Sequence, residues 1–281
     1  MNVFAMVKSF FVCGVLVSLL AGSAFAGAWP REKGAWYHQL TLNTYTADEN
    51  FDDDGDRAAF SNNGEFRDKN MSYYLEYGLL EDLTVTGSLP YKWLEYEDDS
   101  VTNKTDGVSD LEIGLKYRLC SLASGVCSLQ TSIKIPEAYD MADAVPLGNG
   151  QYDYEARLLY GRSLYPHFPG YVNVEAGYRF RAEAPADEFK YLVEAGVDFT
   201  TKFYGRVKLD GTKGMNNADG SETNTDNPTI TYDYDLGKLD VALGWKIVPD
   251  WGMEVGYRPE IYGKNTAAGV NWSLALIYQM N

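Results

Sequence analysis

Long stretches of regular alternation between apolar and polar residues constrain this chain more than any other feature. Between 109 and 119, one face carries Leu111, Ile113, Leu115, Tyr117 and Leu119, and the other carries Glu112, Gly114, Lys116 and Arg118. The stretches 171–181 and 239–247 repeat this pattern. Because successive side chains of a β-strand point to opposite faces, each stretch predicts a strand with one apolar and one charged face.

About twelve such segments run through the chain, each close to the ~10 residues that a tilted membrane-spanning strand needs. We expect them at 35–46, 69–78, 83–96, 109–119, 127–136, 152–163, 171–182, 188–199, 203–212, 233–247, 251–262 and 268–279. Long polar connections, such as the one at 98–107, largely alternate with short ones, as they do in bacterial barrels. The predicted fold class is therefore all-β: a closed, antiparallel, transmembrane up-and-down β-barrel of about 12 strands.

A soluble β-sandwich is the alternative, because it also alternates apolar and polar faces. The segments are, however, longer than ordinary sandwich strands of about 5–6 residues. Aromatic residues such as Tyr91, Trp93 and Trp272 recur on the apolar face, as in the girdles at membrane interfaces. The opposite face carries too many ionisable groups for a dry core, which favours the barrel.

The N-terminus has the three parts of a secretory signal. Lys8 precedes an apolar run at 10–21, and the small residues Ala24 and Ala26 follow it. The run is shorter than the roughly 20 residues of a transmembrane helix, although an uncleaved anchor stays the alternative. We expect a signal peptide at 1–26, cleaved after Ala26, a single barrel domain at 27–281, and location in the bacterial outer membrane.

The net charge limits the kinds of molecule that this chain can bind. The formal net charge of −16 argues against nucleic acid, whose phosphates attract basic proteins. Outer-membrane lipid and a small-molecule solute are the expected partners, and we favour a monomer.

Cys120 and Cys127 remain after processing and flank a turn-like stretch. Because an exported protein meets an oxidising compartment, we expect a disulfide between them.

Three stretches carry a resemblance to a known family: 27–34 continuing into 46–55, 74–91, and 107–118. Together they resemble the outer-membrane barrels named for the meta-pathway of phenol degradation. The resemblance implies an outer-membrane channel or transporter, with a link to the uptake of aromatic compounds in some members. The C-terminus departs from the usual pattern of a final aromatic residue, because Tyr278 stands three positions before Asn281.

Catalytic and cofactor chemistry find little support in the residues. The chain has two histidines, and His38 falls on the apolar face of the first segment. A lipid-modifying enzyme would need a histidine oriented on a serine, and this stays the enzymatic alternative. No zinc spacing, phosphate-binding loop or dinucleotide motif is present, so we expect neither an enzyme nor a cofactor.

The first long connection contains the best candidate for an ion site. Asp52, Asp54 and Asp56 offer several carboxylate oxygens beside Gly55, and calcium prefers such ligands. The full spacing of a calcium-binding loop is absent, and the competing interpretation is a solvated acidic loop.

The charged face of the predicted barrel is the best candidate for a functional surface. Its cations are Lys116, Arg118, Lys134, Arg157, Arg179, Arg181, Arg206, Lys208, Lys246 and Arg258, and its anions include Glu155, Glu175, Glu194 and Asp198. Two interpretations stay open. The charges form rings that set pore selectivity, or they form cross-strand ion pairs that fill the barrel.

The sequence hypothesis is a passive channel for small solutes, including aromatic or organic-acid compounds. We expect Arg179, Arg181, Arg206 and Lys208 to line a constriction and to bind an anionic group. A transporter of hydrophobic compounds, a lipid-modifying enzyme and a structural or surface-binding barrel are the alternatives.

Overall fold

The computed structural model describes residues 27–122, 125–136, 138–219 and 226–280. The signal peptide expected at 1–26 lies outside the described residues. Within these ranges, no helix is long and apolar enough to cross a membrane. The described chain is built from β-strands, with a short 3-10 turn, η1 (Ser61–Asn63).

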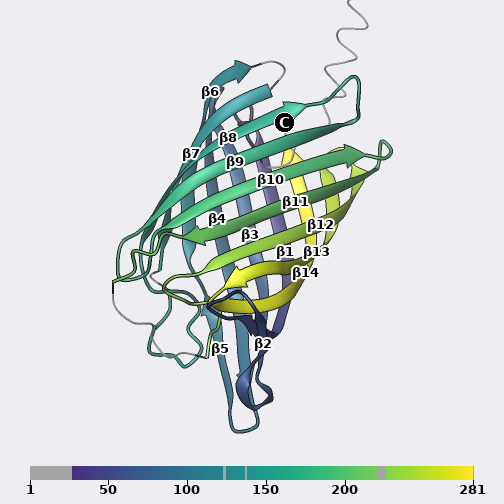
Figure 1. Cartoon of the computed structure of the whole chain (residues 1–281). Coiled ribbons are helices and arrows are strands. Elements are labelled where there is room, and N and C mark those ends of the chain that lie inside the picture. Colours follow the sequence, from purple (N-terminus) through teal and green to yellow (C-terminus); the bar gives the residue numbers. More distant parts are fainter. Residues whose placement is uncertain (1–26, 123–124, 137, 220–225, 281) are drawn as a thin grey trace, which may run out of the picture.

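Twelve long strands close into an antiparallel barrel (Figure 1). They are β1 (Trp36–Phe51), β3 (Glu65–Leu80), β4 (Leu83–Glu97), β6 (Leu111–Leu122), β7 (Gly125–Ile135), β8 (Asp153–Ser163), β9 (Gly170–Arg181), β10 (Glu188–Asp198), β11 (Phe203–Gly214), β12 (Asp235–Val248), β13 (Trp251–Lys264) and β14 (Thr266–Met280). Each pairs with the next, and β14 pairs with β1 from Trp36 opposite Met280 to Phe51 opposite Thr266. This last ladder closes the sheet and confirms the predicted fold class.

Two short strands extend the sheet at the end opposite the C-terminus (Figure 1). Strand β2 (Arg57–Ala59) pairs with β1, and β5 (Thr102–Val108) pairs with β4. The prediction of a loop at 98–107 is therefore wrong, because most of this range belongs to β5. The stretch from Thr102 to Asp106 is polar at every position, so no alternation marked it as a strand.

Burial is inverted relative to a soluble protein. On the outer face of β6, Ile113, Leu115 and Tyr117 are 43%, 46% and 50% exposed, whereas Lys116 inside the barrel is only 1% exposed. Glu76 on β3 is fully buried. Lipid accommodates apolar side chains and excludes ionised ones, so this distribution is that of a membrane-facing outer surface. The alternation read from the sequence is confirmed.

Aromatic side chains form two belts on the outer surface. The belt near the termini includes Trp36, His38, Tyr77, Trp251 and Tyr278, and the second belt includes Tyr91, Trp93, Tyr257 and Trp272. Amphipathic rings favour the two membrane–water interfaces. The belts therefore mark the thickness of the membrane along the barrel.

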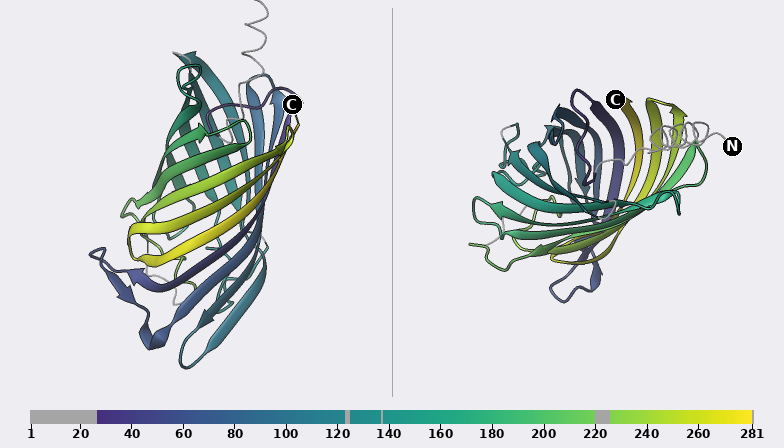
Figure 2. Two further views of the ribbon diagram at one scale, coloured as in Figure 1. Left: turned by 90° about the vertical axis from the view of Figure 1, so that its right-hand side faces the viewer. Right: turned by 90° about the horizontal axis from the view of Figure 1, so that it is seen from above.

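The two ends of the barrel differ in their connections. Turns at 81–82, 199–202 and 249–250 join strands at the end that holds the termini, which faces the viewer in the right-hand view of Figure 2. Longer connections, of which 52–64, 138–152, 215–219 and 226–234 are described, lie at the other end. Because bacterial barrels keep short turns in the periplasm and long loops outside, we call these the periplasmic end and the outer end.

Candidate functional site in the barrel lumen

Three cavities follow one another along the lumen. The periplasmic cavity, of about 260 Å³, and the middle cavity, of about 220 Å³, share Arg157 and Leu192 in their walls. The outer cavity, of about 290 Å³, shares Tyr234, Lys238 and Arg258 with the middle cavity. The shared walls make one series of spaces from the periplasmic half of the lumen to its outer half.

The N-terminal segment 27–35, here called the plug, enters the lumen at the periplasmic end. Ala28 N donates a hydrogen bond to Asn173 Oδ1 (3.3 Å), and Ala28 O accepts one from Ser128 Oγ (2.5 Å). The indole of Trp29 meets the ring of Tyr171 edge-on, with centroids 6.1 Å apart. The plug therefore contacts several strands of the barrel. Ser128 is on β7 and Tyr171 is on β9, whereas Arg31 contacts β3 and β4.

A buried carboxylate between two cations anchors the plug. Arg31 Nε lies 2.6 Å from Glu76 Oε2, and Lys116 Nζ lies 2.8 Å from Glu76 Oε1. Lys116 Nζ also donates to Gly27 O at 2.9 Å, and Tyr74 Oη donates to Glu76 Oε1 at 2.7 Å. Charge-assisted hydrogen bonds of this kind are about twice as strong as neutral ones. They fix the plug to β3 and β6.

The described part of the β7–β8 loop, residues 138–152, is here called the lid, and it folds into the outer end of the barrel. Val145 and Leu147 are 0% and 2% exposed and pack against Phe66 and Leu94, which point inward from β3 and β4. Leu147 O accepts a hydrogen bond from Lys92 Nζ at 2.9 Å. The lid therefore supplies apolar side chains to a lumen that is otherwise mostly polar.

Two hydrogen-bonded groups outside the membrane-spanning strands hold the outer loops. Burial and the Asp110 carboxylate raise the pKa of Tyr139, whose hydroxyl donates to Asp110 Oδ1 at 2.6 Å. Burial alone would raise the pKa of Asp187, but hydrogen bonds from Tyr178 Oη and the Arg181 backbone N–H hold that pKa below its usual range. A titratable side chain therefore contributes hydrogen bonds that hold each of these two loops, the β7–β8 loop and the β9–β10 loop, in place.

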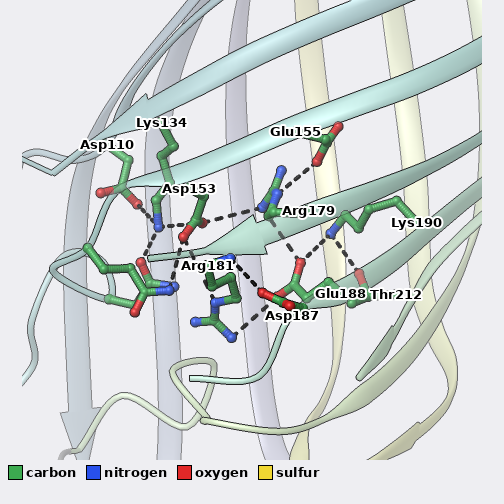
Figure 3. Close-up of polar contacts among 12 residues, drawn as sticks. Asp110, Lys134, Asp153, Glu155, Arg179, Arg181, Asp187, Glu188, Lys190 and Thr212 are labelled. Carbon is green, nitrogen blue, oxygen red and sulfur yellow. Dashed lines mark hydrogen bonds and ion pairs between the residues drawn. The ribbon is translucent and has the colours of Figure 1, made fainter. Parts of the chain in front are cut away.

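An ion network spans four neighbouring strands, β7 to β10, in the outer half of the lumen wall (Figure 3). Its members are Lys134, Asp153, Glu155, Arg179, Arg181, Glu188 and Lys190. Arg179 is its centre, with Nε 2.7 Å from Glu155 Oε2 and Nη1 3.8 Å from Glu188 Oε2. We call it the outer ion network.

A second network, the central ion network, crosses β10 to β13. Its members are Glu194, Arg206, Lys208, Asp210, Asp240, Glu254 and Arg258. Arg206 hydrogen-bonds Glu254 and has Nη1 3.3 Å from Glu194 Oε2. Arg258 Nη2 lies 2.6 Å from Asp210 Oδ2. Most of the charge inside the barrel is thus held in cross-strand ion pairs, one of the two interpretations left open by the sequence.

The four cations expected to line a constriction belong to two different ion networks. Arg179 and Arg181 belong to the outer ion network, whereas Arg206 and Lys208 belong to the central one. All four have carboxylate partners, so the expected single cationic stretch is divided between two largely neutralised clusters. The sequence could not show this, because the acids that pair with the four cations come from other strands.

The remaining expected lumen residues take several places. Lys116 holds the plug, and Lys134 belongs to the outer ion network. Arg157 pairs with Glu155 and Glu175 near the junction of the periplasmic and middle cavities.

Two expected lumen residues lie at the periplasmic end. Arg118 Nη1 is 3.4 Å from Asp82, and Asp198 Oδ1 is 2.8 Å from Lys246 Nζ. They border the lumen entrance instead of lining its middle.

The two cysteines lie opposite each other on β6 and β7, where a register shift between Arg118 and Cys120 brings Cys120 across from Cys127. Both are free thiols, so the expected disulfide is not present in the structure. The pair lies next to the β6–β7 turn at the periplasmic end, and the sequence had indicated only that the two cysteines flank a turn.

The structure does not group the side chains of Asp52, Asp54 and Asp56 as ligands of one ion. Among the described residues, no three His, Cys, Asp or Glu side chains are grouped so that they could hold a metal ion. Asp52 Oδ1 instead accepts hydrogen bonds from the backbone N–H groups of Asp54 and Asp56, each at 2.9 Å. Aspartate commonly closes a turn in this way.

His38 lies in the aromatic belt near the periplasmic end. Its Nδ1 is 2.6 Å from Tyr73 Oη, and its ring stacks on Trp36 and Tyr278. These partners are typical of a membrane-interface residue. A histidine that activates a serine would instead hydrogen-bond the serine hydroxyl.

Sequence reasoning missed three parts of the lumen. The plug and the lid carry no local pattern that predicts insertion into a barrel. Lys190 and Lys238 were also missed, although each is separated by an even number of residues from an acid assigned to the inner face, Glu194 and Asp240 respectively. Counting back by two from those acids would have placed both lysines on the inner face.

No family model and no curated protein matches this chain. Among solved structures, it is similar to the COG4313 outer membrane channel from Pseudomonas putida F1, with a TM-score of 0.73, 15% identity, and coverage of 92% of this chain and 100% of that one. The NanC porin matches with a TM-score of 0.53, 7% identity, and coverage of 85% and 100%. The KdgM porin in complex with disordered oligogalacturonate matches with a TM-score of 0.51, 8% identity, and coverage of 88% and 99%. The chain thus has the fold of outer-membrane channel and porin barrels.

Proposed function

We propose that this chain is a channel of the bacterial outer membrane through which small solutes pass passively. The observation that carries the proposal is the series of three cavities with shared walls, which runs along the lumen of a barrel with an apolar outer face. A barrel filled only for rigidity would pack this volume with side chains. The fold shared with outer-membrane channels supports the same function.

The structure corresponds to a narrowed state of such a channel. The plug occupies the periplasmic end, and the lid occupies the outer end. Solute passage would therefore require the plug to shift, the lid to shift, or both. Each is a connecting or terminal segment, and such segments move more readily than paired strands.

Conductance in planar bilayers tests the proposal. The Trp29→Ala/Arg31→Ala double variant removes an aromatic contact and an ion pair from the plug, so we expect a larger or more frequently open conductance than in the natural chain. Lys33→Ala is the matched control, because Lys33 is exposed in the same segment. If neither the natural chain nor the double variant conducts ions, the barrel is structural or adhesive.

We also propose that the solutes include organic acids and small aromatic compounds. The resemblance to the barrels named for phenol degradation supports the aromatic component. The charged walls of the periplasmic and middle cavities support a polar solute over a wholly apolar one. Liposome swelling with sugars, organic acids and neutral aromatics compares these classes directly.

Four further proposals complete this function. The chain acts as a monomer in lipid, because the β14–β1 ladder leaves no free edge in the barrel. It has no enzymatic role, which the belt position of His38 supports. Its signal peptide is removed after Ala26. The thiols of Cys120 and Cys127 are oxidised to a disulfide after export, which their opposite positions support.

A further inference from the structure

Positively charged side chains predominate in the wall of the middle cavity. Its lining includes the cations Arg157, Arg179, Lys190, Lys238 and Arg258, and a single carboxylate, Asp210. The five cations come from β8, β9, β10, β12 and β13, so five separate strands direct basic groups at one space of about 220 Å³. Their carboxylate partners Glu155, Glu175, Glu188 and Glu260 do not line this cavity. The middle cavity is therefore lined by the cations and not by most of the acids that pair with them.

Two of these cations have hydrogen-bonding capacity that the protein does not use. Arg258 donates through Nη2 to Asp210 Oδ2, but its buried Nε has no partner. Lys238 Nζ comes no closer than 3.7 Å to Glu260 Oε1. Glu260 meanwhile accepts hydrogen bonds from Tyr45 Oη (2.7 Å) and Gly269 N (2.8 Å), so it does not depend on Lys238. The ammonium of Lys238, whose side chain is 31% exposed, can therefore donate hydrogen bonds to a ligand that brings acceptors into the cavity.

The rest of the wall limits the kind of acceptor. Leu192, Leu236 and Tyr234 provide an apolar and aromatic side to the same cavity. A water occupies about 30 Å³ in the liquid, so the space suits a ligand of a few to about ten heavy atoms. A carboxylate on a small apolar or aromatic body matches both the free donors and the apolar side.

We propose that the middle cavity is a binding site for small carboxylates, with the ligand oxygens facing Lys238 and Arg258 and its apolar body facing Tyr234 and Leu236. The site rests on the proposed channel function, in which it would select anionic organic solutes from neutral ones of the same shape. It differs from the anion site expected at Arg179, Arg181, Arg206 and Lys208, because only Arg179 belongs to both.

Calorimetric titration of the detergent-solubilised full barrel with benzoate tests the site without requiring passage. We expect benzoate to bind, and benzyl alcohol, which is nearly the same shape but neutral, to bind at least tenfold more weakly. Lys238→Gln should weaken benzoate binding by roughly tenfold, as loss of one charge-assisted hydrogen bond typically does. Higher salt should weaken it further, since ions screen the attraction.

Lys246→Gln is the matched control, because Lys246 is another lumen lysine that lies at the periplasmic end near Asp198 and away from the middle cavity. We expect it to leave benzoate binding unchanged. Both variants should show the β-rich circular dichroism of the natural chain. Should Lys238→Gln lose the fold, Leu236→Trp, which fills the cavity from its apolar side, replaces it and should abolish binding.

The outcomes separate the site from the channel. Equal binding of benzoate and benzyl alcohol, no binding of benzoate, or equal losses in Lys238→Gln and Lys246→Gln would each overturn the site. Liposome swelling with the same two compounds then reports on passage. Passage without binding overturns the site alone, and binding without passage supports the site while it overturns the channel.

Discussion

Lys116 Nζ and Glu76 Oε1 lie 2.8 Å apart inside the barrel, and the two side chains are only 1% and 0% exposed. Lys116 comes from β6 and Glu76 from β3, so the pair bridges strands that are not neighbours in the sheet. Both groups also hold the plug, Lys116 through Gly27 O and Glu76 through Arg31. The same ion pair therefore stabilises the barrel and holds the plug in its position.

The first prediction concerns that pair. Glu76→Gln leaves Lys116 buried without its charged partner, and loss of one member of a buried pair typically costs about 3–5 kcal/mol. We expect a lower urea midpoint in detergent and weaker protection of the plug against protease. Glu65→Gln, which removes a carboxylate that is 38% exposed and pairs with Arg67, is the control and should cost at most ~1 kcal/mol. Equal effects of the two variants would contradict this account.

The second prediction concerns the lid. Leu147→Asp places a charge in the apolar core formed with Phe66 and Leu94, so the lid should leave the lumen. We expect faster amide exchange in the lid and a larger conductance in bilayers. Ala144→Asp adds the same charge at an exposed lid position and should change neither. A Leu147→Asp barrel with natural exchange rates would show that the apolar contacts do not hold the lid.

The third prediction concerns pH. Hydrogen bonds to Asp187 hold its pKa below its ordinary value of 3.8, so the folded outer loops stabilise the ionised form. This contribution is fully present above the ordinary value and is lost as the pH falls through the lowered pKa. Protection of the β9–β10 loop amides, measured relative to the intrinsic exchange rate at each pH, should therefore fall in acid. Asp187→Asn should flatten this dependence, and an unchanged acid response in that variant would assign it to another group.

The fourth prediction concerns the cysteines. Cys120 and Cys127 are directly opposite across the β6–β7 ladder, where Cα atoms are about 4.5–5.5 Å apart, within the range that a disulfide spans. Mild oxidation of the barrel refolded from reduced protein should therefore close an intramolecular bond and lower the mass by about two hydrogen atoms. Cys120→Ser is the control and should leave one thiol reactive to alkylation. Intermolecular dimers in place of this bond would contradict the pairing.

How much the sequence predicted can be seen on single strands. On β9, Glu175 and Arg179 were predicted on the inner face from alternation alone, and both side chains line the lumen. The period of two belongs to the backbone of any strand, so local sequence is enough to assign the face. The ion-pair partners could not be predicted, because the same information does not reveal which acid on another strand pairs with Arg206.

The sequence by itself determined the barrel, because alternating segments of membrane-spanning length have one apolar face for lipid and one polar face for the interior. Only the tertiary structure decided what fills that interior. The plug, the lid and the two ion networks form when segments far apart in the chain meet inside a closed sheet, as Arg31 meets Glu76 and Leu147 meets Phe66. Such contacts depend on closure and register of the whole barrel, and no local pattern encodes them.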